Sequence, residues 1–305
     1  MKISRPFLFA CLLAATALAS AHAASSLANL SSRGLVGSAS GSLVAGFVVE
    51  GSEAKSILLR GVGPGLAAFG VVNAASAVTV NIYDAGGHLI TTNRGFQTNP
   101  NADLVAETAS RVGAFPLSAE GDSATCVTLM PGAYSLEIAP GSQDAPDGSA
   151  LLEVYDADPA GTTGRLANFS TRALVGPTTG TLISGFVITG TASKILLIRS
   201  VGPDLAVFGI ANAAGPLGIR VFDSNYHLVA KNTGYLTGPD AVTLVRTAAQ
   251  VGAFPLGDTG DSAVVVLLAP GAYFVEATSS TSDAPGGVGL VEVYDADSPS
   301  AEGDN

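Results

Sequence analysis

Tryptophan is absent from this chain of 305 residues, and cysteine and histidine are scarce. Of the two cysteines, Cys11 lies in an apolar N-terminal run, so Cys126 is the single cysteine of the remaining chain and cannot form an intramolecular disulfide there. His88 and His227 are too far from it in sequence to make a closely spaced zinc ligand set. The lack of tryptophan disfavours a sugar-binding platform made of flat aromatic rings.

Charge is scarce as well. Charged residues make up 13% of the chain, about half the usual fraction of ~25%, and the formal net charge is -11. A negative chain cannot bind nucleic acid or anionic lipid through a basic patch, so neither partner is expected. The surface must be rich in small polar and apolar residues, which suits self-association or a polymeric partner. Many small Ala and Gly residues would explain the low charge equally well.

The N-terminus is typical of a secretory signal. Lys2 and Arg5 supply a positive start, residues 6–18 form an apolar run, and Ala21-His22-Ala23 matches a cleavage site. Residues 1–23 are therefore expected to be a signal peptide, with export to the periplasm, the medium or the cell surface. No run is long enough for a transmembrane segment, because turn residues interrupt every candidate.

An internal duplication organises the rest of the chain. Val112-Gly113-Ala114-Phe115-Pro116-Leu117 recurs at residues 251–256, and the motif of residues 153–158 recurs at 292–297, always 139 positions later and without gaps. A unit of this length predicts a complete domain rather than a solenoid repeat. We expect repeat 1 at residues 24–160, repeat 2 at residues 161–297 with a short Gly/Thr-rich linker at its start, and a flexible acidic tail at residues 298–305.

Strand patterns dominate each repeat. Short apolar runs bounded by Gly, Pro, Asn and Asp predict strands at residues 43–49, 56–62, 78–83, 88–92, 124–130, 134–138 and 151–155. Residues 78–83 alternate as a half-buried strand does, and residues 84–87 form a hairpin-type turn. The predicted fold is all-β, with two tandem β-sandwich domains that each carry one short helix.

That helix is expected at residues 102–112 of repeat 1. Asn101 or Asp103 can cap its start, and Gly113 supplies a left-handed stop. Leu104, Val105, Ala109 and Val112 are expected to share its buried face. Asp240 and Gly252 mark the equivalent helix in repeat 2. We expect each helix to plug one end of its sandwich.

Two strings resemble hydrolase motifs. Gly121-Asp122-Ser123 and its copy at residues 260–262 could display a serine nucleophile, with His88 as base and Asp84 behind it. No nucleophile elbow surrounds Ser123. The favoured interpretation is that Asp122 and Ser123 make turn hydrogen bonds, as Asp261 and Ser262 would in repeat 2, and no enzyme activity is expected.

Acidic residues gather near the end of each repeat. Calcium prefers several hard oxygen ligands, so a weak calcium site is conceivable there, and the candidates are Asp144, Asp156, Asp158, Asp283, Asp295 and Asp297. Asp147 becomes Gly286 in repeat 2, and no EF-hand pattern occurs. Solvated turn carboxylates are the competing explanation, and no other cofactor is expected.

A few charged residues occur in both copies. Arg60 and Arg199 are equivalent, as are Glu153 and Glu292, and the pairs Arg33/Arg172, Asp84/Asp223, Asp122/Asp261 and Glu137/Glu276 recur in the same way. In so uncharged a chain they are expected to form cross-strand ion pairs that fix strand register. The Val62-Gly63-Pro64 motif is expected to be a strand-terminating turn rather than a phosphate site.

Several motifs together resemble a known kind of module. They are Leu27-Ala28-Asn29-Leu30-Ser31, Gly46-Phe47-Val48, Leu59-Arg60, Val62-Gly63-Pro64, Tyr83-Asp84, Pro131-Gly132-Ala133-Tyr134 and Glu153-Val154-Tyr155-Asp156. This set resembles a repeat module of large exported proteins of environmental bacteria, and the second half of each unit is loosely similar to bacterial pre-peptidase C-terminal domains. Both resemblances imply a noncatalytic, extracytoplasmic β-sandwich.

The sequence thus leaves three functions in order of preference. The first is a noncatalytic surface or matrix protein that acts in adhesion, assembly or binding through two equivalent domains, with avidity gained from the duplication. The second is a secreted module that binds calcium or carbohydrate. The third, and least favoured, is a serine hydrolase.

Overall fold

A computed structural model describes residues 25–158, 164–177, 180–236, 238, 240–257 and 260–297. The predicted signal peptide, residues 159–163 of the linker predicted from Pro159 to Gly164, and the predicted tail lie outside these ranges. The description therefore covers the body of both repeats.

The fold is all-β, as the sequence predicts. Repeat 1 contributes eight strands, which are β1 (Ser26–Val36), β2 (Leu43–Glu50), β3 (Lys55–Val62), β4 (Val78–Asp84), β5 (Leu89–Arg94), β6 (Ser123–Leu129), β7 (Gly132–Pro140) and β8 (Gly148–Asp156). Repeat 2 contributes β9 (Arg165–Val175), β10 (Leu182–Thr189), β11 (Lys194–Val201), β12 (Leu217–Asp223), β13 (Leu228–Asn232), β14 (Ser262–Leu268), β15 (Gly271–Ser279) and β16 (Gly287–Asp295). Each strand of repeat 2 begins 139 residues after its counterpart, for example at Arg165 against Ser26.

All 16 strands belong to one antiparallel hydrogen-bonded network. It divides into two runs of eight strands, β5-β4-β7-β2-β9-β16-β11-β14 and β13-β12-β15-β10-β1-β8-β3-β6. One residue pair, Leu27 with Leu166, links the two runs. Each run takes four strands from each repeat, so both sheets cross from repeat 1 into repeat 2.

This crossing joins the repeats far more closely than a linker would. Strand β1 pairs with β10 from Ser26 to Arg33, and β2 pairs with β9 from Val44 to Glu50. Ser32 and Ser184 also share a buried hydrogen bond of 2.9 Å across the first of these seams. The two seams are equivalent under the 139-residue offset. Each repeat therefore closes one open edge in each of the other repeat's two sheets, which removes edge strands that would otherwise invite aggregation.

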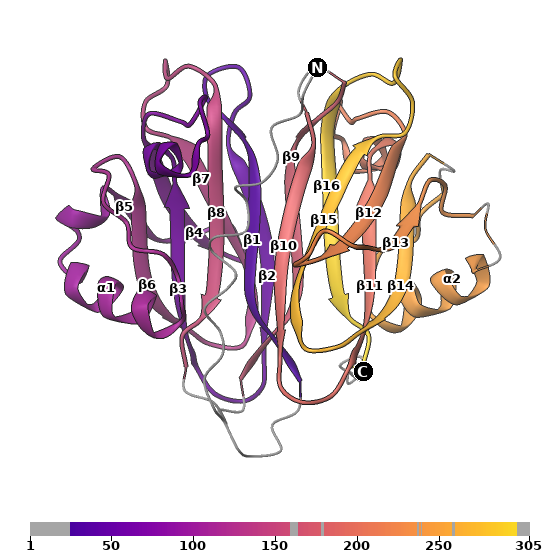
Figure 1. The fold of residues 1–305 in the computed structure, drawn as a ribbon, viewed down its shortest axis with the longest axis horizontal. Coiled ribbons are helices and arrows are strands. Elements are labelled where there is room, and N and C mark those ends of the chain that lie inside the picture. Colours follow the sequence, from indigo (N-terminus) through magenta and orange to yellow (C-terminus); the bar gives the residue numbers. More distant parts are fainter. Residues whose placement is uncertain are drawn as a thin grey trace.

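The hydrophobic core lies between the two sheets and is continuous from one repeat to the other. Alternate residues of β2 are buried, from Leu43 to Val49, because successive side chains of a strand point to opposite faces. The same cluster of buried side chains includes Phe169 and Phe186 of repeat 2. In Figure 1 the two repeats stand side by side along the long axis of the molecule.

One helix per repeat lies on the outside of a sheet. Helix α1 (Ala102–Arg111) packs Val105 and Ala109 against Leu58 and Tyr155, which belong to the outer face of β3 and β8. Helix α2 (Ala241–Gln250) occupies the equivalent place in repeat 2, and the two helices lie at opposite ends of the molecule (Figure 1). None of the helices in the described ranges is long and apolar enough to cross a membrane.

The helix was correctly expected, but its role was not. It covers the outer face of a sheet instead of plugging the end of the sandwich, because the face of β3 and β8 that points away from the core is itself apolar. Leu104 was wrongly assigned to the buried face and is 47% exposed. Asn101 occupies the N-cap position without a side-chain hydrogen bond to the helix, and Gly113 has the expected left-handed backbone, with φ of 74°.

The consequence for function lies in what the helices leave uncovered. Within the described chain, α1 covers the β8-β3-β6 side of repeat 1, and the outer face of β4, β7 and β2 has no helix over it. Repeat 2 is built in the same way, with β12, β15 and β10 uncovered.

Candidate functional site

The Asp122-Ser123 pair serves the fold. Ser123 is fully buried, donates a hydrogen bond of 2.8 Å to the Val78 carbonyl and accepts one of 3.0 Å from the amide of Gly95. Asp122 accepts bonds from the amides of Gly63 and Gly65 at the start of the 3₁₀ helix Pro64–Phe69. The interpretation of Gly121-Asp122-Ser123 and of Val62-Gly63-Pro64 as turn motifs is thus confirmed.

Asp84 and His88 do lie together, but far from Ser123. His88 Nδ1 is 3.1 Å from Asp84 Oδ2, and the hydrogen bond from the His88 amide is the largest cause that lowers the pKa of Asp84. Ser123 contacts the first residue of β4 and Asp84 is its last, which separates them by roughly 20 Å at the usual rise per residue. The structure does not assemble the triad. Ser262 and His227 in repeat 2 have the same contacts.

The calcium candidates surround lysines instead. Lys55 Nζ is 2.8 Å from Asp156 and 3.3 Å from Asp158, and this lysine is fully buried. In repeat 2, Lys194 Nζ lies 2.7 Å from Asp295 and 3.6 Å from Asp297. An ammonium thus holds the position that a metal ion would take between the carboxylates.

The remaining two calcium candidates stand apart from these clusters. Asp144 and Asp283 are exposed on loops. In the described part of the chain, no three His, Cys, Asp or Glu side chains are grouped so that they could hold a metal ion. The carboxylates therefore stabilise the ends of β3 and β11 through their lysines.

Of the recurring charged residues expected to form cross-strand ion pairs, Arg60 with Glu153 and Arg199 with Glu292 do so, on the outer face of the sheet beneath an aromatic ring. Arg60 Nε is 3.1 Å from Glu153 Oε2 at directly opposed positions of β3 and β8, and both side chains are buried. The Arg60 guanidinium also stacks 4.3 Å from the centroid of the Phe115 ring. Arg199 and Glu292 repeat this pair in repeat 2, over Phe254.

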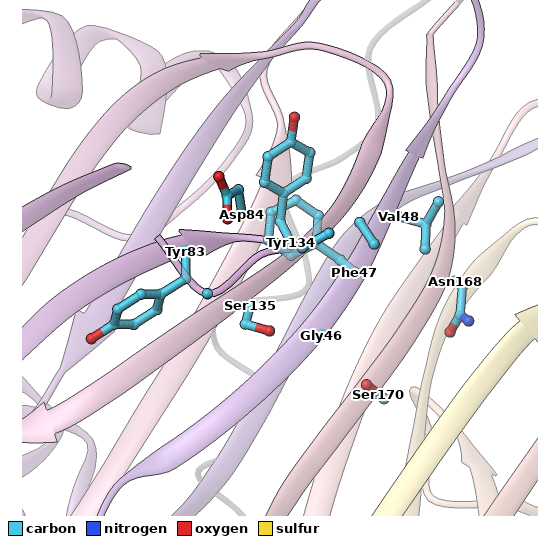
Figure 2. Close-up of a pocket in the computed structure, with 12 residues that line it drawn as sticks. Gly46, Phe47, Val48, Tyr83, Asp84, Tyr134, Ser135, Asn168 and Ser170 are labelled. Atoms are coloured by element: carbon cyan, nitrogen blue, oxygen red, sulfur yellow. The ribbon is translucent and has the colours of Figure 1, made fainter. Parts of the chain in front are cut away.

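A groove of about 500 Å³ opens on the uncovered face of repeat 1. Figure 2 shows its lining, which is made of side chains from β2, the β4–β5 hairpin, β7 and β9. Its residues are Gly46, Phe47, Val48, Tyr83, Asp84, Ala85, Gly87, Ala133, Tyr134, Ser135, Asn168 and Ser170. The groove therefore takes residues from both repeats, since β9 belongs to repeat 2.

Four residues form one row across the groove, one from each of four adjacent strands. Tyr83 of β4 stands opposite Ser135 of β7, which stands opposite Gly46 of β2, and Gly46 stands opposite Ser170 of β9. A side chain at Gly46 would collide with Ser170 Oγ, because its Cβ would come within 2.7 Å. Glycine therefore gives the groove a low floor at the seam between the repeats.

The polar groups of the groove are of two kinds. The Tyr83 hydroxyl donates to Glu137, which with burial raises the pKa of Tyr83, and the Tyr134 hydroxyl donates to the Met130 carbonyl. Ser135 is exposed and Ser170 is half-buried, and the described hydrogen bonds leave both hydroxyls available. The groove thus has one fixed aromatic wall, the Tyr83 ring, and hydroxyl groups on its floor, while the Tyr134 ring packs on Phe47 toward the core.

Repeat 2 fills the equivalent groove with its own rings. Phe274 replaces Ser135 and is only 5% exposed. It stacks on Phe222 with ring centroids 4.9 Å apart and meets the edge of Tyr226 at 5.2 Å. Tyr226 replaces Gly87 and is the one non-glycine residue of the described chain with positive φ, at 65°. Because the left-handed region costs a non-glycine residue about 1 kcal/mol, the ring contact must offset that strain.

The equivalent arginines beside the two grooves also differ in exposure. Arg33 of β1 adjoins the filled groove and is half-buried, and burial lowers its pKa while Tyr226 acts in the opposite direction. Its counterpart Arg172 of β9, beside the open groove, is exposed. An arginine next to the open groove is therefore free to approach a bound partner.

Sequence patterns alone missed this groove. Tyr83, Asp84 and Tyr134 stood out only in motifs shared with exported repeat modules, in a hairpin turn and in a possible triad, and none of these patterns indicates a groove. The available signal was the comparison of the two repeats, because Ser135 against Phe274 and Gly87 against Tyr226 are large changes of side-chain volume within an otherwise similar pair of hairpins. The changes become informative once the fold places them side by side.

Comparisons with known proteins add little. No protein-family model matches the chain, and no curated protein matches it. Among solved structures, a chain of Sulfolobus Turreted Icosahedral Virus aligns with 10% identity and a TM-score of 0.18, over 89% of this chain and 57% of the viral one. Oxalate decarboxylase of Bacillus subtilis aligns with 10% identity and a TM-score of 0.16, over 88% of this chain and 69% of the enzyme. A Penaeus vannamei nodavirus chain aligns with 8% identity and a TM-score of 0.17, over 87% of this chain and 82% of the viral one. Likenesses at these TM-scores support no argument about function.

Proposed function

We propose that this chain is a noncatalytic, exported surface or matrix protein that binds its partner through the open groove of repeat 1. The observation that carries the proposal is the contrast between the grooves. In repeat 2 the same fold buries its own Phe274 ring, whereas in repeat 1 the space is left open next to exposed hydroxyls. An open groove with a rigid aromatic wall and a few polar groups is a usual form of a recognition site.

Binding is favoured over catalysis by what the reactive side chains already do. Ser123 and Ser262 are buried and bonded to backbone groups, and so are Asp122 and Asp261. The buried Glu153 and Glu292 are paired with arginine. Asp84 accepts bonds from the amides of Gly86 and His88, which hold it in the hairpin. The side chains that the sequence offered for a catalytic triad are thus engaged in the fold, which supports a binding role over a catalytic one.

Export and an extracellular role rest on the sequence. Residues 1–23 have the pattern of a signal peptide, and the motifs resemble exported repeat modules. The low charge supports contact with an uncharged surface or polymer better than with nucleic acid. We accordingly assign the protein to the periplasm or the cell surface, where a binding groove would meet matrix material.

The proposal is tested by binding of the purified protein to bacterial cells and to their extracted extracellular polymer. The wild-type protein should sediment with one or both, and Ser135→Phe should lose this binding because a ring then fills the groove as in repeat 2. The matched control is Thr79→Phe, which places the same ring on the same face of β4, beyond the groove. Equal binding by all three proteins, or no binding by any of them, would refute the proposal.

A further inference from the structure

We infer that the occupant of the repeat 1 groove is an uncharged sugar ring of a polysaccharide, which sits where the Phe274 ring lies in repeat 2. The inference rests on the proposed function and names its ligand. It follows from three features of the groove, which are its shape, its hydrogen-bonding groups and its charge.

The shape is defined by repeat 2. There the row across the four strands is Phe222, Phe274, Gly185 and Ser31, in the same register as Tyr83, Ser135, Gly46 and Ser170. The low glycine floor is the same, since a Cβ at Gly185 would lie 2.6 Å from Ser31 Oγ. Repeat 2 therefore shows that a six-membered ring fits above this floor, and repeat 1 lacks that ring and the Tyr226 ring beside it.

The hydrogen-bonding groups decide what kind of ring fits. The open groove has the hydroxyls of Ser135 and Ser170 where the filled groove has the Phe274 ring over its floor, and the nearby Asn168 side chain is already bonded to Tyr294. An aromatic side chain from a partner would bury these two hydroxyls without hydrogen bonds, which is unfavourable. A sugar ring instead presents a C–H face to an aromatic wall and hydroxyls around its rim.

Figure 2 shows the corresponding layout. Tyr83 lies at one end of the row and Asn168 and Ser170 lie at the other, with Ser135 and Gly46 between them, while the Tyr134 ring points away from Ser135 and stacks on Phe47. A ring above Gly46 would thus have the Tyr83 ring on one side and polar groups on the opposite side. This is a groove between strands, so it does not need the flat tryptophan platform whose absence the sequence reveals.

Charge restricts the sugar to an uncharged one. Asp84 lines the groove and Glu137 adjoins it through its bond with Tyr83, while Arg172 lies two residues from Ser170 on the same face of β9. Two carboxylates against one guanidinium disfavour an anionic sugar, and the formal net charge of -11 disfavours an anionic polymer at longer range.

The test is a binding screen with defined probes. The purified protein is titrated against soluble neutral polysaccharides, namely dextran, laminarin, galactomannan, arabinoxylan and xyloglucan, with alginate as the anionic probe and a Tyr- and Phe-rich peptide as the aromatic probe. We expect at least one neutral polymer to bind with one site per chain. Ser135→Phe should weaken that binding at least tenfold, and Thr79→Phe should leave it unchanged.

A reverse variant makes the inference sharper. Phe274→Ser with Tyr226→Gly empties the groove of repeat 2 and should raise the number of binding sites per chain from one to two, measured by calorimetry with an oligosaccharide of the bound polymer. Circular dichroism establishes that each variant is folded. Because this variant gains a site, its result cannot be explained by damage to the protein.

Three outcomes would overturn the inference. They are binding of the aromatic peptide or of alginate in place of the neutral polymers, no binding of any probe, and binding of a neutral polymer that Ser135→Phe does not affect. If cells still bind the wild-type protein and Ser135→Phe abolishes that binding while no neutral polymer binds, the ligand class is wrong and the proposed function stands.

Discussion

Repeat 1 and repeat 2 agree closely inside and differ where the sheets face solvent. The buried pair Arg60–Glu153 recurs as Arg199–Glu292, each under an aromatic ring. At the uncovered sheet face, by contrast, repeat 1 has the exposed Ser135 at the position where repeat 2 has the buried Phe274. The internal contacts maintain the fold in both copies, and the outer face is where the copies differ.

The seam explains why one groove can be closed without loss of the other. Each groove is completed by a strand of the opposite repeat, β9 for repeat 1 and β1 for repeat 2. Filling the groove of repeat 2 with Phe274 buries a ring over the seam β1–β10 and adds apolar contact there. We therefore interpret repeat 2 as the half that stabilises the molecule and repeat 1 as the half that binds.

The largest expected effect concerns the shared interior. Glu153→Leu and Glu292→Leu each leave a buried arginine without its carboxylate, which should cost about 3–5 kcal/mol in the free energy of unfolding. Because both sheets and the core are continuous, either variant should lower the stability of the whole chain. Urea unfolding followed by fluorescence and by far-UV circular dichroism should give one coincident transition. Two separate transitions would show that the repeats unfold independently.

The next largest effect is a pH dependence of stability that arises in repeat 2. Burial, with the nearby Asp204 carboxyl as a further cause, raises the pKa of Asp261 from 3.8 to about 7. The folded state then binds this proton more tightly than the unfolded state does, so its contribution is complete below about pH 3.8 and is lost as the pH rises towards 7. The loss from this group amounts to up to about 4 kcal/mol.

Repeat 1 supplies the variant for that measurement, since Gly65 stands where repeat 2 has Asp204. Asp204→Gly removes the neighbouring carboxyl and should flatten the fall in stability between pH 4 and pH 7, as measured by urea unfolding at each pH. The slope is the informative quantity, because the variant also loses the hydrogen bond from the Gly257 amide. An unchanged slope would mean that burial alone sets the pKa of Asp261.

Much of this fold could be predicted from the sequence. Alternation of apolar residues located β2 to β8, and the hairpin at Asp84 and the buried Arg60–Glu153 pair were correctly expected. Strand β1 was missed because it is rich in Asn, Ser and Gly and has a bulge between Leu27 and Asn29 that breaks the alternation. Local patterns do not specify which repeat a strand pairs with.

The candidate site was less predictable for the same reason. A groove depends on which strands are neighbours, and here β2 has β9 of the other repeat as its neighbour. The volume changes at Ser135 and Gly87 are visible in the sequence, but only the register places them in one groove with Ser170. The lysines that occupy the carboxylate clusters were likewise distant in sequence, since Lys55 lies far from Asp156.

A smaller effect on the free energy of unfolding is expected from changes in the two grooves. Removal of the Phe274 ring from repeat 2 should cost more than addition of a ring at Ser135 of repeat 1. Phe274→Ser exposes Phe222 and opens a groove, which should cost about 2–3 kcal/mol, the lower range for loss of a buried ring, because the site is at the surface. Ser135→Phe should change stability by less than about 1 kcal/mol, since an exposed serine is replaced. Thermal unfolding measures both. Equal losses in the two variants would remove the asymmetry between the repeats.

The smallest expected effect tests whether the Tyr226 ring supports Phe274. Gly87→Tyr alone should destabilise repeat 1 by about 1 kcal/mol, because Gly87 has φ of 78° and a tyrosine there is strained without a ring to contact. Combined with Ser135→Phe, the same change should cost less, since the two new rings can pack as Tyr226 and Phe274 do at 5.2 Å. The double-mutant cycle should therefore give a favourable coupling of about 0.5–1.5 kcal/mol. Zero coupling would mean that the strain at Tyr226 is offset by something other than Phe274, and Arg33, which acts electrostatically on Tyr226, would be the next residue to test.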